Sequence, residues 1–305
     1  MCRSSFLGFD FSPLKPEDIG VLSGFLKRYP QQLTGYTFAS LAAWNTFFHY
    51  KWIFAAPESL LISCILDSDA HPRLLQPIGQ LSAELIDTLI KRAADLNYPL
   101  KIIGVSEQFL KENPAFAESF YVVEDRAVSN YLYSAQALAQ LRGRKYSKKR
   151  NLISQARALY SWTCVALNRS WLDSCFEVLD SIMKEEHLVP DGMLGRELAA
   201  LEYTLKHFEE LQQQGLLITV DGKPVAFSIF EPINPSTVAI HFERALRSYK
   251  GLYQVINWET AKVIAEQGFE YINREEDLGD PGLRDAKLSY HPIQIIPAYE
   301  LTFKK

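Results

Sequence analysis

The residues best suited to chemistry gather in the last third of the chain, where predicted strands end and helices begin. A strand over residues 237–243 ends in His241 and Glu243, which share a face because side chains alternate along a strand. An imidazole and a carboxylate on one face can serve as a general base and the group that orients it. The alternative is a half-exposed strand with its polar side chains turned outward. We take Glu243 and His241 as candidate catalytic residues.

Lys250 and Gly251 follow this strand, at the start of a helix predicted over residues 252–266. The first turn of a helix offers free N–H groups and a positive dipole end to an anion. A lysine there opposes the dipole unless an anion is bound, and a glycine lets a ligand approach the backbone. The pair predicts a donor-phosphate site, although the glycine could equally serve the turn alone.

A second polar cluster spans residues 273–287, after a strand predicted over residues 271–273. Its candidate binding residues are Asn273, Arg274, Glu275, Arg284 and Lys287. The first is taken as a cofactor ligand and the other four as substrate ligands. Three adjacent acidic residues, 275–277, cannot all point inward on a regular element, so we expect no metal site. Local salt bridging among Arg274, Glu275 and Arg284 is the alternative.

The segment 142–150 carries six positive residues in nine positions. On a predicted helix over residues 145–159, Lys145, Lys148 and Lys149 share one face, with Arg142 a turn earlier. Such repulsion among like charges is relieved when an anion binds, so the segment predicts contact with the phosphate of a cofactor, a lipid headgroup or an RNA. We take Lys145, Lys149 and Arg150 as candidate ligands of an anion. The alternative is a solvated helix face.

The remaining pattern is mixed α/β. Other predicted helices cover residues 16–28, 83–97, 106–112, 170–186 and 194–214, with a short one from Pro281. Other predicted strands cover residues 52–55, 60–66, 100–105, 120–123, 162–167, 216–220, 225–230 and 298–303, with a hairpin turn at Asp221-Gly222. Both halves follow a similar order of elements, which predicts two domains, residues 1–135 and residues 136–305.

Composition narrows the function classes. The 305 residues are 48% hydrophobic and 22% charged, with a net charge of −4, so the whole molecule is not a generic binder of nucleic acid or membrane. No apolar run reaches the ~18–20 residues of a membrane span, and the four cysteines form no CxxC pair. We therefore expect a cytoplasmic protein without a transmembrane segment. The sequence has no GxSxG, P-loop or strand-linked GxGxxG motif.

Several short motifs together resemble a known family. They are Tyr131-x-Tyr133, Leu141-x-Gly143-x-Lys145, Lys149-Arg150-Asn151, His241-x-Glu243, the segment 273–279, Gly282-x-Arg284, Lys287 and Pro292. The chain resembles the bacterial DUF2156 family, which is similar to the C-terminal catalytic domain of phosphatidylglycerol lysyltransferases. Two departures matter: Asn130 stands where an acid is expected, and no membrane domain accompanies the motifs.

The resemblance implies two tandem acetyltransferase-type (GNAT-like) domains, with a degenerate first domain and the site in the second. It implies an acyltransferase or aminoacyltransferase that uses acyl-CoA or aminoacyl-tRNA as co-substrate, without a tightly bound cofactor. A small-molecule amine or hydroxyl, or a lipid headgroup, would be the acceptor, and tRNA a partner. Tyr290 would be the acid for the leaving group. The alternative is a non-catalytic binding or regulatory protein on the same scaffold.

Overall fold

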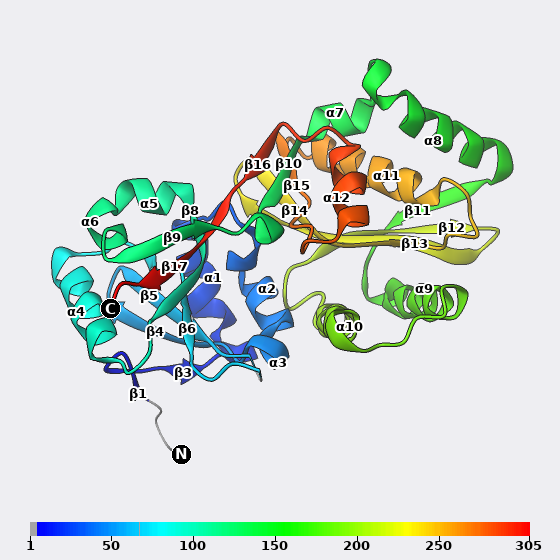
Figure 1. The fold of residues 1–305 in the computed structure, drawn as a ribbon. Coiled ribbons are helices and arrows are strands. Elements are labelled where there is room, and N and C mark those ends of the chain that lie inside the picture. The colour runs from blue at the N-terminus through cyan, green and yellow to red at the C-terminus, as the bar shows by residue number, and fades with distance from the viewer. Residues whose placement is uncertain (1–4, 67) are drawn as a thin grey trace. The chain divides into compact units, whose positions relative to one another are not determined.

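The computed structural model describes residues 5–66 and 68–305, which divide into two compact units (Figure 1). The first unit holds residues up to Asn130 together with Ile296–Lys305, and the second holds Tyr131–Ile295. The prediction had placed the boundary at residue 135 and the whole C-terminus in the second domain. It was wrong at the end of the chain because the last strand pairs with two strands of the first unit. Backbone pairing, which connects segments distant in sequence, decides this assignment.

The first unit is built on a mixed sheet in the order β3-β4-β5-β6-β8-β17-β9, with β7 paired to β5. A separate two-stranded sheet precedes it. The strands are β1 (Ser5–Phe6), β2 (Phe9–Asp10), β3 (Ser12–Pro13), β4 (Lys51–Ala56), β5 (Ser59–Cys64), β6 (Arg73–Leu75), β7 (Ile78–Gly79), β8 (Lys101–Ser106), β9 (Phe120–Glu124) and β17 (Ala298–Phe303).

Helices cover this sheet. They are α1 (Ile19–Arg28), α2 (Phe38–Ala43), α3 (Asn45–Phe48), α4 (Ala83–Asp95), α5 (Glu107–Glu112) and α6 (Pro114–Ala117), with 3₁₀ turns at Pro16–Asp18, Thr34–Tyr36 and Arg126–Val128. Helix α4 buries Leu85, Leu89 and Ala93 against the strands, as its helical spacing predicts. Its first turn is capped by Ser82, whose Oγ accepts the Leu85 N–H at 3.2 Å.

The second unit has a sheet in the order β11-β12-β13-β14-β15-β10-β16. Its strands are β10 (Asn130–Ser134), β11 (Trp162–Ala166), β12 (Gln214–Val220), β13 (Lys223–Asn234), β14 (Thr237–Ala245), β15 (Tyr271–Asn273) and β16 (Gln294–Ile296). The predicted hairpin is confirmed: Asp221 and Gly222 have φ of 51° and 77°, as a two-residue turn between twisted strands requires. Most neighbours are antiparallel, but β14 and β15 are parallel.

Helices pack on both faces of this second sheet. Figure 1 shows α9 and α10 on one side and α7, α8 and α11 on the other. Their bounds are α7 (Ala135–Gln140), α8 (Ser147–Leu159), α9 (Leu172–Glu185), α10 (Gly192–Lys206), α11 (Leu252–Glu266) and α12 (Pro281–Leu288), with 3₁₀ turns at Arg144–Tyr146 and Arg169–Trp171. Helix α12 is capped by Asp280, whose Oδ1 accepts the Leu283 N–H at 2.6 Å.

One predicted helix is too long. Residues 194–214 were expected to be helical, but α10 ends at Lys206 and β12 begins at Gln214. Phe208 and Leu211 continue the helical spacing and are buried, which explains the error. The chain between them and the strand includes Gln212 with φ of 54°, a left-handed conformation that no helix accommodates.

Candidate functional site

The candidate site lies at the splayed end of β14 and β15, within the second unit. The two strands pair only as far as Ala239 and Asn273. Beyond this point β14 continues to Ala245, while the chain leaves β15 and turns away. Side chains from the two diverging segments bridge the gap. Polar groups thus gather where parallel strands end, the place where open α/β sheets bind ligands.

Arg274 and Glu243 form the centre of this bridge. An Nη of Arg274 donates to Glu243 Oε1 at 2.8 Å, and the Asn257 amide donates to the other carboxylate oxygen at 3.2 Å. The guanidinium lies over the rings of Tyr290 and Tyr133, 4.9 and 5.9 Å from their centroids. Only 9% of the Glu243 side chain is exposed, so this is a buried ion pair between aromatic faces.

Lys149 also contacts the Tyr290 ring. Its ammonium lies 3.8 Å from the ring centroid and donates to Ser289 Oγ at 2.7 Å. Burial lowers the pKa of Lys149 to about 8, and repulsion from Arg274 adds to the shift. Burial also holds the pKa of Tyr290 well above its ordinary value. At neutral pH the site therefore offers a protonated phenol in contact with two cations.

His241 lies between two carboxylates. Its Nδ1 is 2.7 Å from Glu275 Oε1, and its Nε2 is 2.8 Å from Glu231 Oε1. Burial by itself would lower the pKa of His241, but the hydrogen bonds to Glu231 and Glu275 outweigh it and raise the pKa to about 10. The ring is therefore a cation that donates from both nitrogens at neutral pH, and it has no lone pair for accepting a proton. These contacts fit a positioning residue better than the predicted base.

The acidic segment 275–277 follows β15, and its three side chains are not equally buried. Asp277 is buried, whereas Glu275 and Glu276 are half-buried. The backbone is irregular here: Glu275 has φ of 59°, and its N–H is bound by Asn273 Oδ1 at 2.8 Å. The side chain of Asn273 thus supports the turn. No group of three or more His, Cys, Asp or Glu side chains suited to a metal occurs in residues 5–66 and 68–305.

Asp277 and Lys287 connect this segment to α12. Arg284 donates two hydrogen bonds to the Asp277 carboxylate, of 2.8 and 2.9 Å, and the Tyr131 hydroxyl donates to the same carboxylate at 2.5 Å. The hydrogen bond from Arg284 lowers the pKa of Asp277 well below its usual range. The Lys287 ammonium donates to the carbonyls of residues 274 and 276. Arg284 and Lys287, predicted to bind substrate, therefore hold the backbone that carries Arg274 and Glu275.

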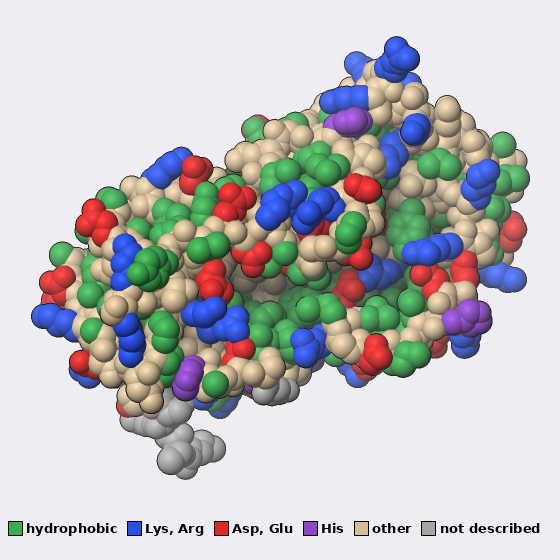
Figure 2. Space-filling view, in the orientation of Figure 1, with side chains coloured by type: hydrophobic (Ala, Val, Ile, Leu, Met, Phe, Trp, Pro, Cys, Tyr) green, Lys and Arg blue, Asp and Glu red, His purple; other side chains and the backbone are tan. Residues whose placement is uncertain are grey.

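The basic segment separates into two sets. Arg150 is occupied structurally, because it donates to the Leu141 and Gly143 carbonyls. The helix starts at Ser147, two residues later than predicted, so Lys145 lies in the preceding 3₁₀ turn and not on a shared helical face with Lys149. Arg142, Arg144, Lys145 and Lys148 are exposed, as is Arg150. Figure 2 shows Lys and Arg side chains clustered at the tip where α8 begins.

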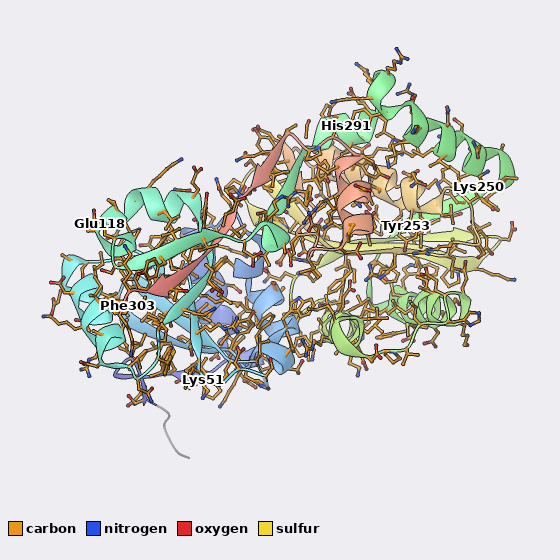
Figure 3. All side chains as sticks on the ribbon, viewed as in Figure 1. Lys51, Glu118, Lys250, Tyr253, His291 and Phe303 are labelled. Carbon is orange, nitrogen blue, oxygen red and sulfur yellow. The ribbon has the colours of Figure 1, made fainter. Side chains whose placement is uncertain are left out.

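The Lys250–Gly251 loop differs from the expected anion cradle. Gly251 has φ of 86°, and a Cβ there would lie 2.5 Å from the Leu152 carbonyl of α8. The close approach is therefore made by protein backbone. The Lys250 N–H is bound by the Tyr160 hydroxyl at 3.2 Å, and the Lys250 side chain is exposed near the end of α8 (Figure 3).

Three residues of the site were missed. Glu231 lies one residue beyond the predicted strand end at 230, and β13 continues to Asn234 after a register shift at Ile229–Phe230. Asn257 is a buried polar residue among the apolar positions of α11, and Tyr133 was noted only as part of a motif. A polar residue inside an apolar helical stripe is the signal that could have found Asn257.

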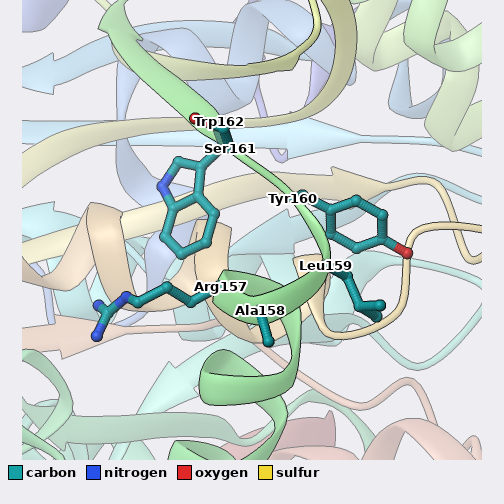
Figure 4. Close-up of a pocket in the computed structure, with 6 residues that line it drawn as sticks. All are labelled: Arg157, Ala158, Leu159, Tyr160, Ser161 and Trp162. Carbon is teal, nitrogen blue, oxygen red and sulfur yellow. The ribbon is translucent and has the colours of Figure 1, made fainter.

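A shallow pocket lies elsewhere in this unit, where α8 ends and β11 begins (Figure 4). It has a volume of about 430 Å³ and is lined by Arg157–Trp162. Among the described residues, none of the helices combines the length and apolar character needed to cross a membrane.

Comparison with known proteins places the fold. A conserved protein of unknown function from Bacteroides thetaiotaomicron is 30% identical, with a TM-score of 0.88 over 96% of this chain and 99% of that one. L-PGS from Bacillus licheniformis is 14% identical, with a TM-score of 0.66 over 96% of this chain and 93% of the other. A tandem GNAT protein from the clavulanic acid pathway is 9% identical, with a TM-score of 0.50 over 96% and 97%. These similarities confirm the predicted GNAT-like mixed α/β fold.

A search of curated proteins finds no match. The family model described as "Phosphatidylglycerol lysyltransferase, C-terminal" matches residues 26–302, nearly the whole chain. A C-terminal DUF2156 domain of a putative lysylphosphatidylglycerol synthetase from Agrobacterium fabrum shares the fold, at 15% identity and a TM-score of 0.67 over 95% of this chain and 92% of that one. The predicted resemblance is thereby confirmed, and the chain belongs to the family of phosphatidylglycerol lysyltransferase C-terminal domains.

Proposed function

We propose that the second unit transfers an acyl or aminoacyl group from a thioester or aminoacyl ester to an amine or hydroxyl. One observation carries the proposal: the buried Arg274–Glu243 pair, held between Tyr133 and Tyr290 at the open end of parallel strands. Buried ion pairs cost desolvation and seldom repay it in stability. A charged group kept at such a cost, in a family named for acyl transfer, is suited to reaction chemistry.

In the proposed reaction the acceptor attacks the donor carbonyl. A new C–N or C–O bond forms, and the C–S or C–O bond to the leaving group breaks. Glu243 takes the proton of the acceptor, exchanging its bond with Asn257 for one with the acceptor. Arg274 and Lys149 stabilise the developing oxyanion, and Tyr290 donates a proton to the leaving group. Protonated His241 orients Glu275 and Glu231 without exchanging a proton.

The exposed cations at the start of α8 supply the second part of the proposal. They form a patch that consists of Arg142, Arg144, Lys145 and Lys148, with no acidic residue beside them in the sequence. Its positive charge is suited to the phosphates of a tRNA donor or a lipid headgroup. If tRNA binds there, neutralising Lys145 and Lys148 should make its affinity less dependent on salt. The slope of log affinity against log salt concentration should fall by about 1 for each phosphate contact that is lost. An unchanged slope would assign tRNA binding to another surface.

The test is a transfer assay with radiolabelled lysyl-tRNA or acetyl-CoA as donor, and phosphatidylglycerol vesicles or small amines as acceptor. Glu243→Gln should lower the transfer rate by roughly 100-fold or more, because the amide cannot accept the proton. Glu177→Gln, an exposed change on α9, is the matched control. Full activity of Glu243→Gln would remove Glu243 as the base.

A second candidate function is that of a non-catalytic binding protein. It is favoured because the polar groups of the site already have hydrogen-bond partners within the protein. Both oxygens of Glu243 and both nitrogens of His241 have partners within the protein. This candidate would be supported if no donor gave transfer and if tRNA or vesicles nevertheless raised the melting temperature of the protein.

A further inference from the structure

The loop between β14 and α11, residues 246–251, is occupied by groups of the protein itself. In a strand–loop–helix of this kind, a phosphate binds when several backbone N–H groups are free to point at it. Here the N–H groups of Leu246, Tyr249 and Leu252 donate to backbone carbonyls at 3.0–3.3 Å. The Lys250 N–H donates to Tyr160. Few backbone donors of the loop remain for an anion.

Acidic side chains in and near α9 and α10 occupy other donors. The carboxylate of Glu185 accepts both the N–H and the hydroxyl of Ser248. Glu186 is 2.9 Å from the Arg247 guanidinium. On the neighbouring strand end, Glu197 pairs with Arg244. Carboxylates from the α9–α10 region thus bind the groups that could otherwise contact a phosphate at this loop. These groups are the two Ser248 donors and the two arginines.

The Arg247–Glu186 ion pair and the Leu152 carbonyl beside Gly251 oppose a bound phosphate to different degrees. The Arg247–Glu186 pair is exposed on the arginine side and by itself contributes little. The Leu152 carbonyl, however, lies within 2.5 Å of where a Cβ of Gly251 would be, and it belongs to the backbone of α8. A phosphate entering the loop would meet this fixed oxygen as well as the carboxylates, and like charge at short range is costly.

We infer that Glu185 and Glu186 are specificity-determining residues that exclude diphosphate-bearing donors such as coenzyme A thioesters from this loop. The inference rests on the proposed acyl-transfer function. It also replaces the expectation that Lys250 and Gly251 bind a donor phosphate. Glu185 accepts from the Ser248 donors, Glu186 neutralises Arg247, and the backbone of α8 fills the space beside Gly251. An acyl donor of this protein must therefore be held through groups other than this loop.

The experiment titrates inorganic pyrophosphate and coenzyme A into the full chain by isothermal titration calorimetry at fixed salt. The variant Glu185→Ala/Glu186→Ala frees Ser248 and Arg247, and it should bind pyrophosphate about tenfold or more tightly than the unmodified protein. Adding Arg247→Ala should abolish the gain, which locates it at the loop. Asp180→Ala, an exposed acidic residue of the same helix, is the matched control and should change nothing.

Two results would overturn the inference. One is coenzyme A or pyrophosphate binding by the unmodified protein that weakens on Arg247→Ala alone. The other is a folded double variant, judged by circular dichroism, whose pyrophosphate affinity is unchanged. Should the alanine pair not fold, Glu185→Gln/Glu186→Gln removes the charge and keeps an acceptor for Ser248. The titration needs no turnover, so loss of transfer with every donor would contradict the proposed function and leave this test intact.

Discussion

In each unit a pair of neighbouring strands is parallel, β6 with β8 and β14 with β15, and the two pairs end in different chemistry. After β6, Gln76 Oε1 accepts the Ser106 N–H at 2.8 Å and the Ser106 hydroxyl at 2.9 Å. The Tyr36 hydroxyl binds the Gln76 N–H at 2.9 Å and the Gly104 carbonyl at 2.8 Å. These groups are neutral, and together they join the two segments into a closed structural network.

After β15 the corresponding bridge is charged. Arg274 pairs with Glu243, and His241 lies between two carboxylates. Neutral hydrogen bonds satisfy buried backbone at little cost, whereas buried charges require desolvation. The first unit thus joins its strand end with neutral hydrogen bonds, whereas the second keeps buried charges there, where we place the proposed reaction.

The largest effect is expected from breaking the charged bridge. Arg274→Met leaves Glu243 buried without its cation, and should lower the free energy of unfolding by about 3–5 kcal/mol. Urea denaturation measures the loss. Adding Glu243→Gln should recover part of it, since the uncompensated charge is then removed. An Arg274→Met protein as stable as the original would show that the pair contributes no more than an exposed salt bridge does.

The His241 pair should give a pH-dependent effect. Its folded pKa of about 10 lies above the ordinary value of 6.5, so the contribution to stability is complete below about pH 6.5 and is lost as pH rises through 10. His241→Gln should cost about 1.5–3 kcal/mol at pH 6 and much less near pH 10. Unfolding of both proteins across this range measures the difference. A cost that does not vary with pH would mean that His241 is neutral in the folded protein.

The neutral bridge of the first unit should give a smaller, pH-independent effect. Gln76→Leu leaves the Ser106 N–H without its acceptor, and should cost about 1–3 kcal/mol. The same variant should leave acyl transfer unchanged, in contrast to Glu243→Gln. Loss of transfer in a folded Gln76→Leu protein would contradict the structural role assigned to the first unit.

The smallest effect is a titration. Because burial and Arg274 lower the pKa of Lys149 to about 8, its ammonium should lose its proton near that pH. Nuclear magnetic resonance of the reductively methylated lysines would follow it, with Lys149→Arg identifying the signal. In Arg274→Met the pKa of Lys149 should rise, provided that the variant folds. No change would mean that burial alone lowers it.

Much of the fold was accessible from local pattern. The spacing of Leu85 and Leu89 predicted α4, and Asp221-Gly222 predicted the hairpin. Both signals depend on neighbouring residues only. Boundaries such as the end of α10 were less accessible, since buried Phe208 continues the helical spacing after the helix has ended.

The candidate site was accessible in part. The structure brings Glu243, Arg274, Tyr290 and Lys149 into successive contacts, each with the next, and His241 against Glu275. The catalytic and binding roles of these residues stay predictions. Glu231 was not found because the predicted strand ends at residue 230. The β13–β14 register shifts beside it and leaves His241 unpaired, and such a shift has no signature in local spacing.

The sequence by itself determined the residue types, the family motifs and most of the elements, because these depend on short-range spacing and composition. Only the tertiary structure decided the partners. It assigned the last strand to the first unit, made His241 a cation between two carboxylates and filled the Gly251 loop with the protein's own groups. The physical reason is that charge state and access depend on burial and on contacts between segments far apart in the chain.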